Sequence, residues 1–86
     1  MNNAIKFNMR QVLLREFGGY EIKRMPPIVF DNRWRSFNAV RDGQTARFIV
    51  LMDAERKVCV IQQAKGGKVH KFSYANMSDK QGVING

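Results

Sequence analysis

Apolar side chains near the N-terminus recur at positions i, i+3, i+4 and i+8, which places them on one side of an amphipathic helix. These residues are Met9, Val12, Leu13 and Phe17. We expect Asn8 to cap the start of this helix and Gly18 to end it in a left-handed conformation. The alternation in Ala4–Phe7 predicts a short strand ahead of the helix, with a helical extension as the alternative.

The rest of the chain alternates between apolar and polar residues, as strands do, and is punctuated by turn residues. Asp42-Gly43 and Gly66-Gly67 are dipeptides that suit two-residue hairpin loops, and residues 53–56 predict a third turn. The four strands expected around these turns are Trp34–Arg41, Thr45–Met52, Val58–Ala64 and Val69–Tyr74. They predict an antiparallel meander over about residues 34–75.

The two hairpin loops also predict how the strands pair, because a loop's length fixes the register of its hairpin. A loop at Asp42-Gly43 pairs Phe37 with Phe48. It also puts Arg47 on the opposite face, together with Asn38. A loop at Gly66-Gly67 predicts the pairs Gln63–His70, Ile61–Phe72 and Cys59–Tyr74.

Two segments leave alternatives open. Tyr20–Met25 alternates like a strand and is followed by Pro26-Pro27, so we expect an edge strand that is broken at the prolines. Thr45–Met52 is apolar on both faces, and one helix covers only one of them. Its second face requires the Tyr20–Phe30 segment, curling of the sheet into a barrel, or a homodimer.

These elements predict an α+β fold in which an N-terminal amphipathic helix packs on a mostly antiparallel sheet. A chain of 86 residues buries enough surface for one modest core. We therefore expect a single small domain over residues 1–76, followed by a flexible polar tail at 77–86.

The charge of the chain is strongly positive: 15 Lys and Arg residues against 7 Asp and Glu residues give a net charge of +8. The segment from Arg56 to Ser78 holds five of these cations and no acid. Phosphates attract such a concentration of positive charge without special geometry. The sequence therefore favours a nucleic-acid-binding protein, for DNA or RNA, that acts mainly through phosphate contacts.

The candidate binding residues combine this basic segment with cations of the first hairpin and one aromatic ring. They are Lys65, Lys68, Lys71, Arg56, Lys57, Arg35, Arg41 and Trp34. Trp34, which stands between two arginines, is the ring that we expect to be exposed and able to stack on a base, whereas Phe37, Phe48 and Phe72 are assigned to the core. The alternative is a protein-interaction module or inhibitor whose basic face docks an acidic protein partner.

Several functional classes find no support in the sequence. One cysteine and one histidine are too few for a structural zinc site, so we expect no metal and no cofactor. No nucleophile or acid–base pair is apparent, and we expect no enzymatic activity. No apolar run is long enough to span a membrane. Cys59, between two valines, is typical of a buried apolar residue, and we expect a reducing, cytoplasmic compartment.

Overall fold

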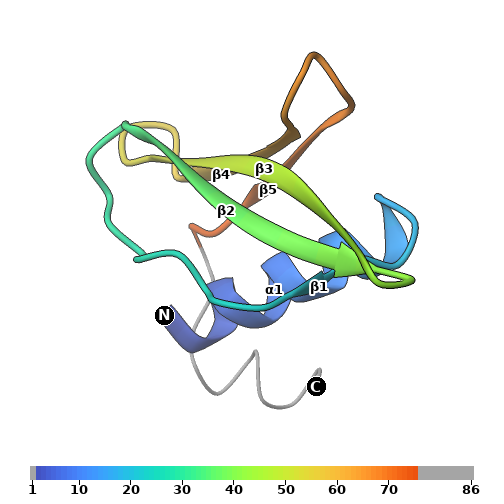
Figure 1. The fold of residues 1–86 in the computed structure, drawn as a ribbon. Coiled ribbons are helices and arrows are strands. Elements are labelled where there is room, and N and C mark those ends of the chain that lie inside the picture. The colour runs from blue at the N-terminus through green and yellow to red at the C-terminus, as the bar shows by residue number, and fades with distance from the viewer. Residues whose placement is uncertain (1, 76–86) are drawn as a thin grey trace.

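A computed structural model describes residues 2–75, in which one helix packs against a five-stranded antiparallel sheet (Figure 1). The elements are α1 (Asn2–Arg15), β1 (Glu21–Ile22), β2 (Trp34–Arg41), β3 (Gln44–Asp53), β4 (Val58–Gln63) and β5 (Val69–Ser73). Each strand pairs with the next one in sequence. The α+β fold and the meander over residues 34–75 are therefore confirmed. The expected tail at 77–86 and residue 76 lie outside the described residues.

The helix starts earlier than the sequence predicts. The expected strand at Ala4–Phe7 is wrong, because α1 already includes these residues. Ile5 lies one helical turn before Met9, and both are fully buried, so the helical conformation extends the apolar stripe by another turn. Asn8 is therefore inside the helix rather than at its start, and its side-chain amide donates to the Ala4 carbonyl at 3.0 Å.

The left-handed conformation predicted for Gly18 is confirmed, although α1 itself already ends at Arg15. Gly18 has a φ of 88°, in the left-handed region that glycine adopts readily. Beyond it the amides of Gly19 and Tyr20 both donate to the Leu13 carbonyl, at 3.1 and 3.2 Å. The chain thereby reverses and enters β1, a two-residue edge strand at Glu21–Ile22 that is shorter than the Tyr20–Met25 segment predicted.

The first hairpin has the predicted register. Phe37 pairs with Phe48 and Asn38 with Arg47. Asp42 and Gly43 have φ values of 52° and 78°, as a two-residue turn with positive φ at both positions requires.

The second hairpin is shifted by two residues from the predicted register. Ile61 pairs with His70 rather than with Phe72, which pairs with Cys59. The cause is a longer turn: the Gln63 amide donates to the Lys68 carbonyl, and four residues lie between them. Because side chains alternate with a period of two, a shift of two leaves every residue on its predicted face.

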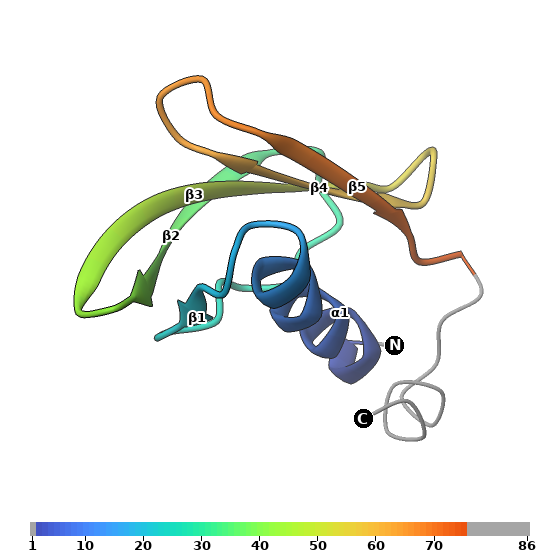
Figure 2. The same ribbon diagram turned by 90° about the vertical axis from the view of Figure 1, so that its right-hand side faces the viewer.

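The sheet curls around α1, which lies in its hollow (Figure 2). The helix contributes Ile5, Met9 and Leu13 to the core, Phe17 joins them from just after the helix, and the sheet contributes alternate residues of β2, β3 and β4. Phe37 and Phe48 belong to this core as predicted, and Phe72 is half-buried against it. Cys59 is also fully buried, which confirms that prediction, and burial raises the pKa of its thiol to about 12.

The segment between α1 and β2 packs on the same side of the sheet as the helix. Tyr20, Ile22, Met25 and Ile28 all contact the core cluster. This segment therefore does not cover the second face of β3, contrary to one of the alternatives that the sequence left open. The sheet also stays an open sheet, since β1 and β5 are at opposite ends of the strand order. No helix among the described residues is long and apolar enough to cross a membrane.

Candidate nucleic-acid interface

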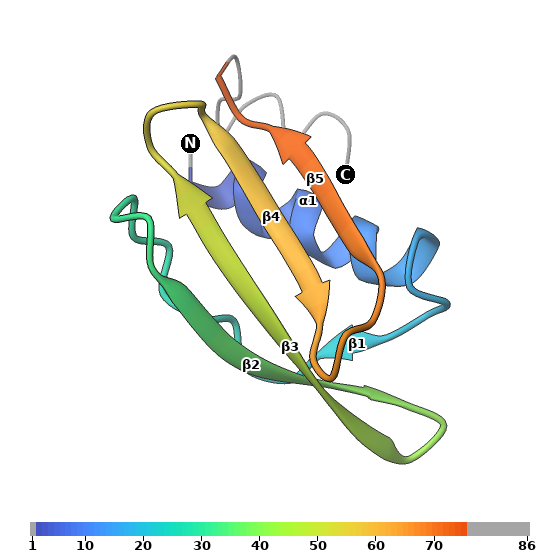
Figure 3. The same cartoon turned by 90° about the horizontal axis from the view of Figure 1, so that it is seen from above.

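The face of the sheet turned away from α1, which we call the outer face, carries no other element of the described chain (Figures 2 and 3). Cross-strand pairing places Trp34, Leu51, Val60 and Lys71 in one row across it. Ser36, Ile49, Gln62 and Val69 form the next row. Trp34 is 49% exposed and Val69 is 45% exposed. The outer face is therefore apolar in its middle and cationic at one end of the Trp34 row.

Trp34 is exposed as the sequence predicts, and the structure adds what surrounds it. It occupies the first position of β2, and Leu51 is its direct neighbour on β3. Lys71, at the other end of the row, is exposed and has no ionic partner among residues 2–75. Of the predicted site residues, Trp34 and Lys71 are the two that one face of the sheet brings together.

Two predicted site arginines are bound to neighbouring carboxylates. Both terminal nitrogens of Arg35 donate to the carboxylate of Asp31, each at 2.7 Å. This hydrogen bonding lowers the pKa of Asp31 to about 2. Arg56 donates to Asp53 at 3.1 Å, while its side chain stays 82% exposed. Hydrogen bonding, first from the Arg56 backbone amide, lowers the pKa of Asp53. These pairs remove part of the free charge on which the sequence argument relied.

Two further cations hold the C-terminal end of α1. The Lys68 ammonium donates to the Glu16 carbonyl at 2.7 Å and lies 3.8 Å from its carboxylate. The Arg41 guanidinium donates to the Gly18 carbonyl at 3.3 Å and stacks 4.5 Å from the centre of the Tyr20 ring. Cations are favourable beside these carbonyls, which have no partner within the helix. The geometry gives Lys68 and Arg41 a structural role.

The remaining predicted cations, Lys57 and Lys65, are exposed at opposite ends of β4. Lys57 follows the β3–β4 turn, and Lys65 is in the β4–β5 turn. Six strand residues separate these turns, about 20 Å at the rise of an extended strand. The basic segment from Arg56 onward is therefore spread over both ends of the hairpin and over two faces.

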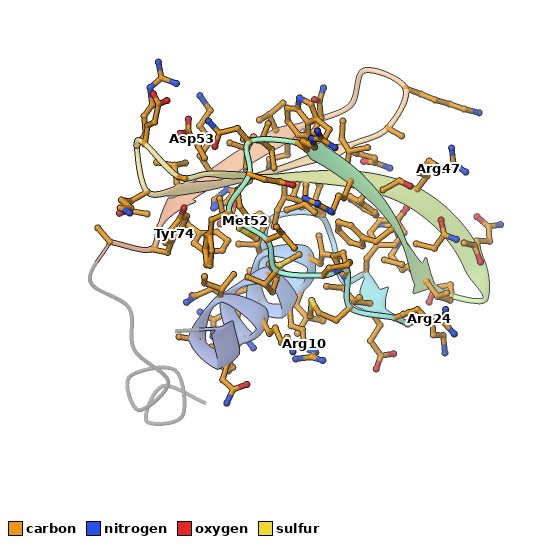
Figure 4. All side chains as sticks on the ribbon, turned by 90° about the vertical axis from the view of Figure 1, so that its left-hand side faces the viewer. Arg10, Arg24, Arg47, Met52, Asp53 and Tyr74 are labelled. Atoms are coloured by element: carbon orange, nitrogen blue, oxygen red, sulfur yellow. The ribbon has the colours of Figure 1, made fainter. Side chains whose placement is uncertain are left out.

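Arg47 is a basic residue of the outer face that the candidate set omits. It pairs with Asn38 on β2 and is exposed. Figure 4 shows it on the outer side of the sheet, whereas Arg10 and Arg24 are on the side of the helix. The register of the Asp42-Gly43 hairpin already placed Arg47 on this face. The density of charge along the chain does not single out Arg47, because its place depends on position across the sheet.

The β2–β3 hairpin and the β4–β5 turn enclose an open groove of about 560 Å³. Arg47 and Lys65 line it from its two sides, together with Asn38, Thr45 and Gln63. Sequence spacing could not reveal this groove, since it depends on the curl of the sheet and on the four-residue turn.

The described residues offer no grouping suited to metal binding. Among residues 2–75, no three His, Cys, Asp or Glu side chains are grouped closely enough to hold a metal ion. Comparison of the whole chain with models of protein families, with curated proteins and with solved structures found no match. The proposals below therefore rest on the geometry of this chain.

Proposed function

We propose that this protein binds nucleic acid through the outer face of its sheet. The observation that carries the proposal is Trp34, which is half-exposed on a sheet face that no other described element covers. Two cations of the same face, Arg47 and Lys71, have no ionic partner among residues 2–75. Base stacking on an aromatic ring contributes about 1–3 kcal/mol per base. Cations elsewhere on the face can hold phosphates farther along the same strand.

The distances across the outer face suit a strand longer than one nucleotide. Arg47 pairs with Asn38, four residues from Trp34 along β2, which is about 13 Å at the usual strand rise. Lys71 is three strands away from Trp34, about 14 Å at the usual spacing between strands. The three side chains thus form a triangle across which an unpaired strand can be laid.

Few carboxylates oppose a polyanion on this face. Within the described sheet, the register places Glu21 on the outer side of the edge strand β1 and Asp53 on the outer side at the end of the central strand β3, two residues beyond Leu51. Asp53 is already bonded by Arg56 and by two backbone amides. The middle of the face, between Trp34 and Lys71, holds no acid. Together with the net charge of +8, this favours attraction of phosphates.

Trp34 is the single tryptophan of the chain, so its fluorescence reports on the proposed site directly. The test titrates the protein with single-stranded DNA, single-stranded RNA and duplex DNA at about 50 mM and about 200 mM salt. We expect the single strands to quench the indole. With two phosphate contacts, from Arg47 and Lys71, affinity for a single strand should fall about sevenfold between these salt concentrations.

A pair of variants separates stacking from general apolar contact. Trp34→Leu should weaken binding of a labelled single strand roughly 5- to 150-fold, the equivalent of one lost stacking interaction. Phe30→Leu is the matched control, because Phe30 is 38% exposed but packs on Tyr74, on the helix side. The proposal is refuted if no nucleic acid binds at the lower salt, or if both variants behave alike.

The second candidate is an acidic protein partner docked on the same face. Its supporting observation is the exposed apolar area at Trp34 and Val69, which a protein partner would cover. A partner retained in a pull-down after nuclease treatment, together with no quenching by any oligonucleotide, would favour this candidate.

A further inference from the structure

The groove between the two hairpins contains two cations with no carboxylate to balance them. Arg47 belongs to β3 and Lys65 to the β4–β5 turn, and both line the groove. Neither forms an ion pair with any residue that the structure describes, and none of the lining residues is acidic. Two unbalanced positive charges facing a common space of about 560 Å³ indicate an anion as its ligand.

The neutral polar side chains of the groove each carry a hydrogen-bond donor. Asn38 and Gln63 each have an amide, and Thr45 has a hydroxyl. An arginine can donate two parallel hydrogen bonds to a phosphate, whereas a lysine acts as a compact charge. Together these groups can donate hydrogen bonds to both free oxygens of a phosphodiester.

The backbone holds the two sides of the groove in place. The Ala64 amide donates to the Arg47 carbonyl at 2.9 Å, which ties the turn directly to β3. The Gly67 amide donates to the Gln63 carbonyl at 3.1 Å and closes the turn. Lys65 itself has a φ of 67°, a left-handed conformation that costs a non-glycine residue about 1 kcal/mol or more. A cation therefore occupies a turn position at which glycine would be less strained.

We propose that this groove binds one phosphodiester group of the strand that the outer face holds. The inference rests on the proposed function, because Arg47 belongs both to the groove and to the outer face. A strand anchored between Arg47 and Lys65 continues along β2 toward Trp34, where a base can stack. The groove thus fixes the position of one phosphate of the bound strand. Trp34 then lies at a defined distance from that phosphate.

The test compares three substitutions that each remove one positive charge: Arg47→Gln, Lys65→Gln and the control Arg10→Gln. Arg10 is exposed on the helix side of the molecule, away from the groove (Figure 4). Affinity for a labelled single-stranded oligonucleotide is measured against salt concentration, and thermal melting confirms that each variant is folded. Amide shifts of Ala64, Gly66 and Gly67 in wild-type NMR spectra report on the turn.

Because both cations face the same phosphate, we expect Arg47→Gln and Lys65→Gln each to reduce the salt slope by up to about 0.7 and the affinity by up to about eightfold at 50 mM salt. Arg10→Gln should change neither quantity by a comparable amount, and the turn amides should shift on binding. If the oligonucleotide binds and quenches Trp34 but the groove variants behave like Arg10→Gln, the phosphate site in the groove is refuted. Nucleic-acid binding by the outer face is not refuted by that result. If wild-type protein binds no oligonucleotide, both proposals fail.

Discussion

Phe48 is the residue on which the core is centred, and its replacement by alanine gives the strongest test of the packing. The side chain is fully buried. Its ring lies 5.3 Å from Phe17, 5.1 Å from Tyr20 and 5.7 Å from Phe37, measured between ring centres. Phe17 and Tyr20 belong to the segment that links α1 to β1, and Phe37 belongs to β2. One side chain therefore joins the linking segment to the sheet.

The expected loss can be worked out from these contacts. Phe→Ala in a protein core costs about 3–5 kcal/mol, as lost transfer energy and as the cavity left behind. Aromatic pairs add about 0.5–1.5 kcal/mol beyond burial, and three pairs are lost here. We therefore expect about 5 kcal/mol, the upper end of the range. A chain of 86 residues has a total stability of about 4–13 kcal/mol. The Phe48→Ala variant is thus close to the limit of folding.

Thermal unfolding followed by far-UV circular dichroism measures this loss. At roughly 4–8 °C per kcal/mol, the variant should melt at least 20 °C below the wild-type protein or be unfolded at room temperature. Phe30→Ala is the control: this ring is 38% exposed and has one aromatic neighbour, so we expect about 1–2 kcal/mol. The assigned core would be contradicted if Phe48→Ala melted within about 5 °C of the wild-type protein. It would also be contradicted if Phe48→Ala lost no more stability than Phe30→Ala.

Two further predictions concern a carboxylate and a glycine. The Arg35 hydrogen bonds lower the pKa of Asp31 to about 2, below its unfolded value of about 3.9, so the stability from this pair is complete above pH 4 and is lost as the pH falls toward 2. In Arg35→Gln, an NMR titration should show the pKa of Asp31 returning toward its ordinary value; an unchanged pKa would exclude Arg35 as the cause. Gly67→Ala would place a methyl group 2.8 Å from the Gln63 β-carbon, so the turn must shift. Urea unfolding should show a loss of about 1–3 kcal/mol, and a loss near zero would show that the turn yields freely.

The hairpins show how far local patterning reaches. Asp42-Gly43 specified both turn type and register, because a two-residue loop with positive φ at each position permits one pairing. The face of each strand residue also followed from the period of two. The register of β4 and β5 did not follow, because Gly66-Gly67 allows a two-residue loop and a four-residue loop equally well. Gly67 is needed in the longer turn, since a β-carbon there would meet Gln63.

The charged side chains show where local patterning does not predict the structure. The pairing of Arg35 with Asp31 spans four residues and lies within reach of sequence reasoning. The contact of Lys68 with Glu16 spans 52 residues and exists because the β4–β5 turn lies over the end of α1. A run of cations along the chain therefore does not predict a cationic surface. Each charge is placed by the fold and can be satisfied by a carbonyl or a carboxylate far away in sequence.

By itself, the sequence determined the four strands of the meander, the Asp42-Gly43 turn, the exposure of Trp34 and which strand side chains share a face, because these depend on spacing and on backbone preferences within a few residues. The tertiary structure alone decided where the helix began, which side of the sheet stayed open, and which cations remained unpaired. It also brought Arg47 and Lys65 to one groove. The physical reason is that burial and charge pairing depend on distances in space, which are set only when the sheet curls around its helix.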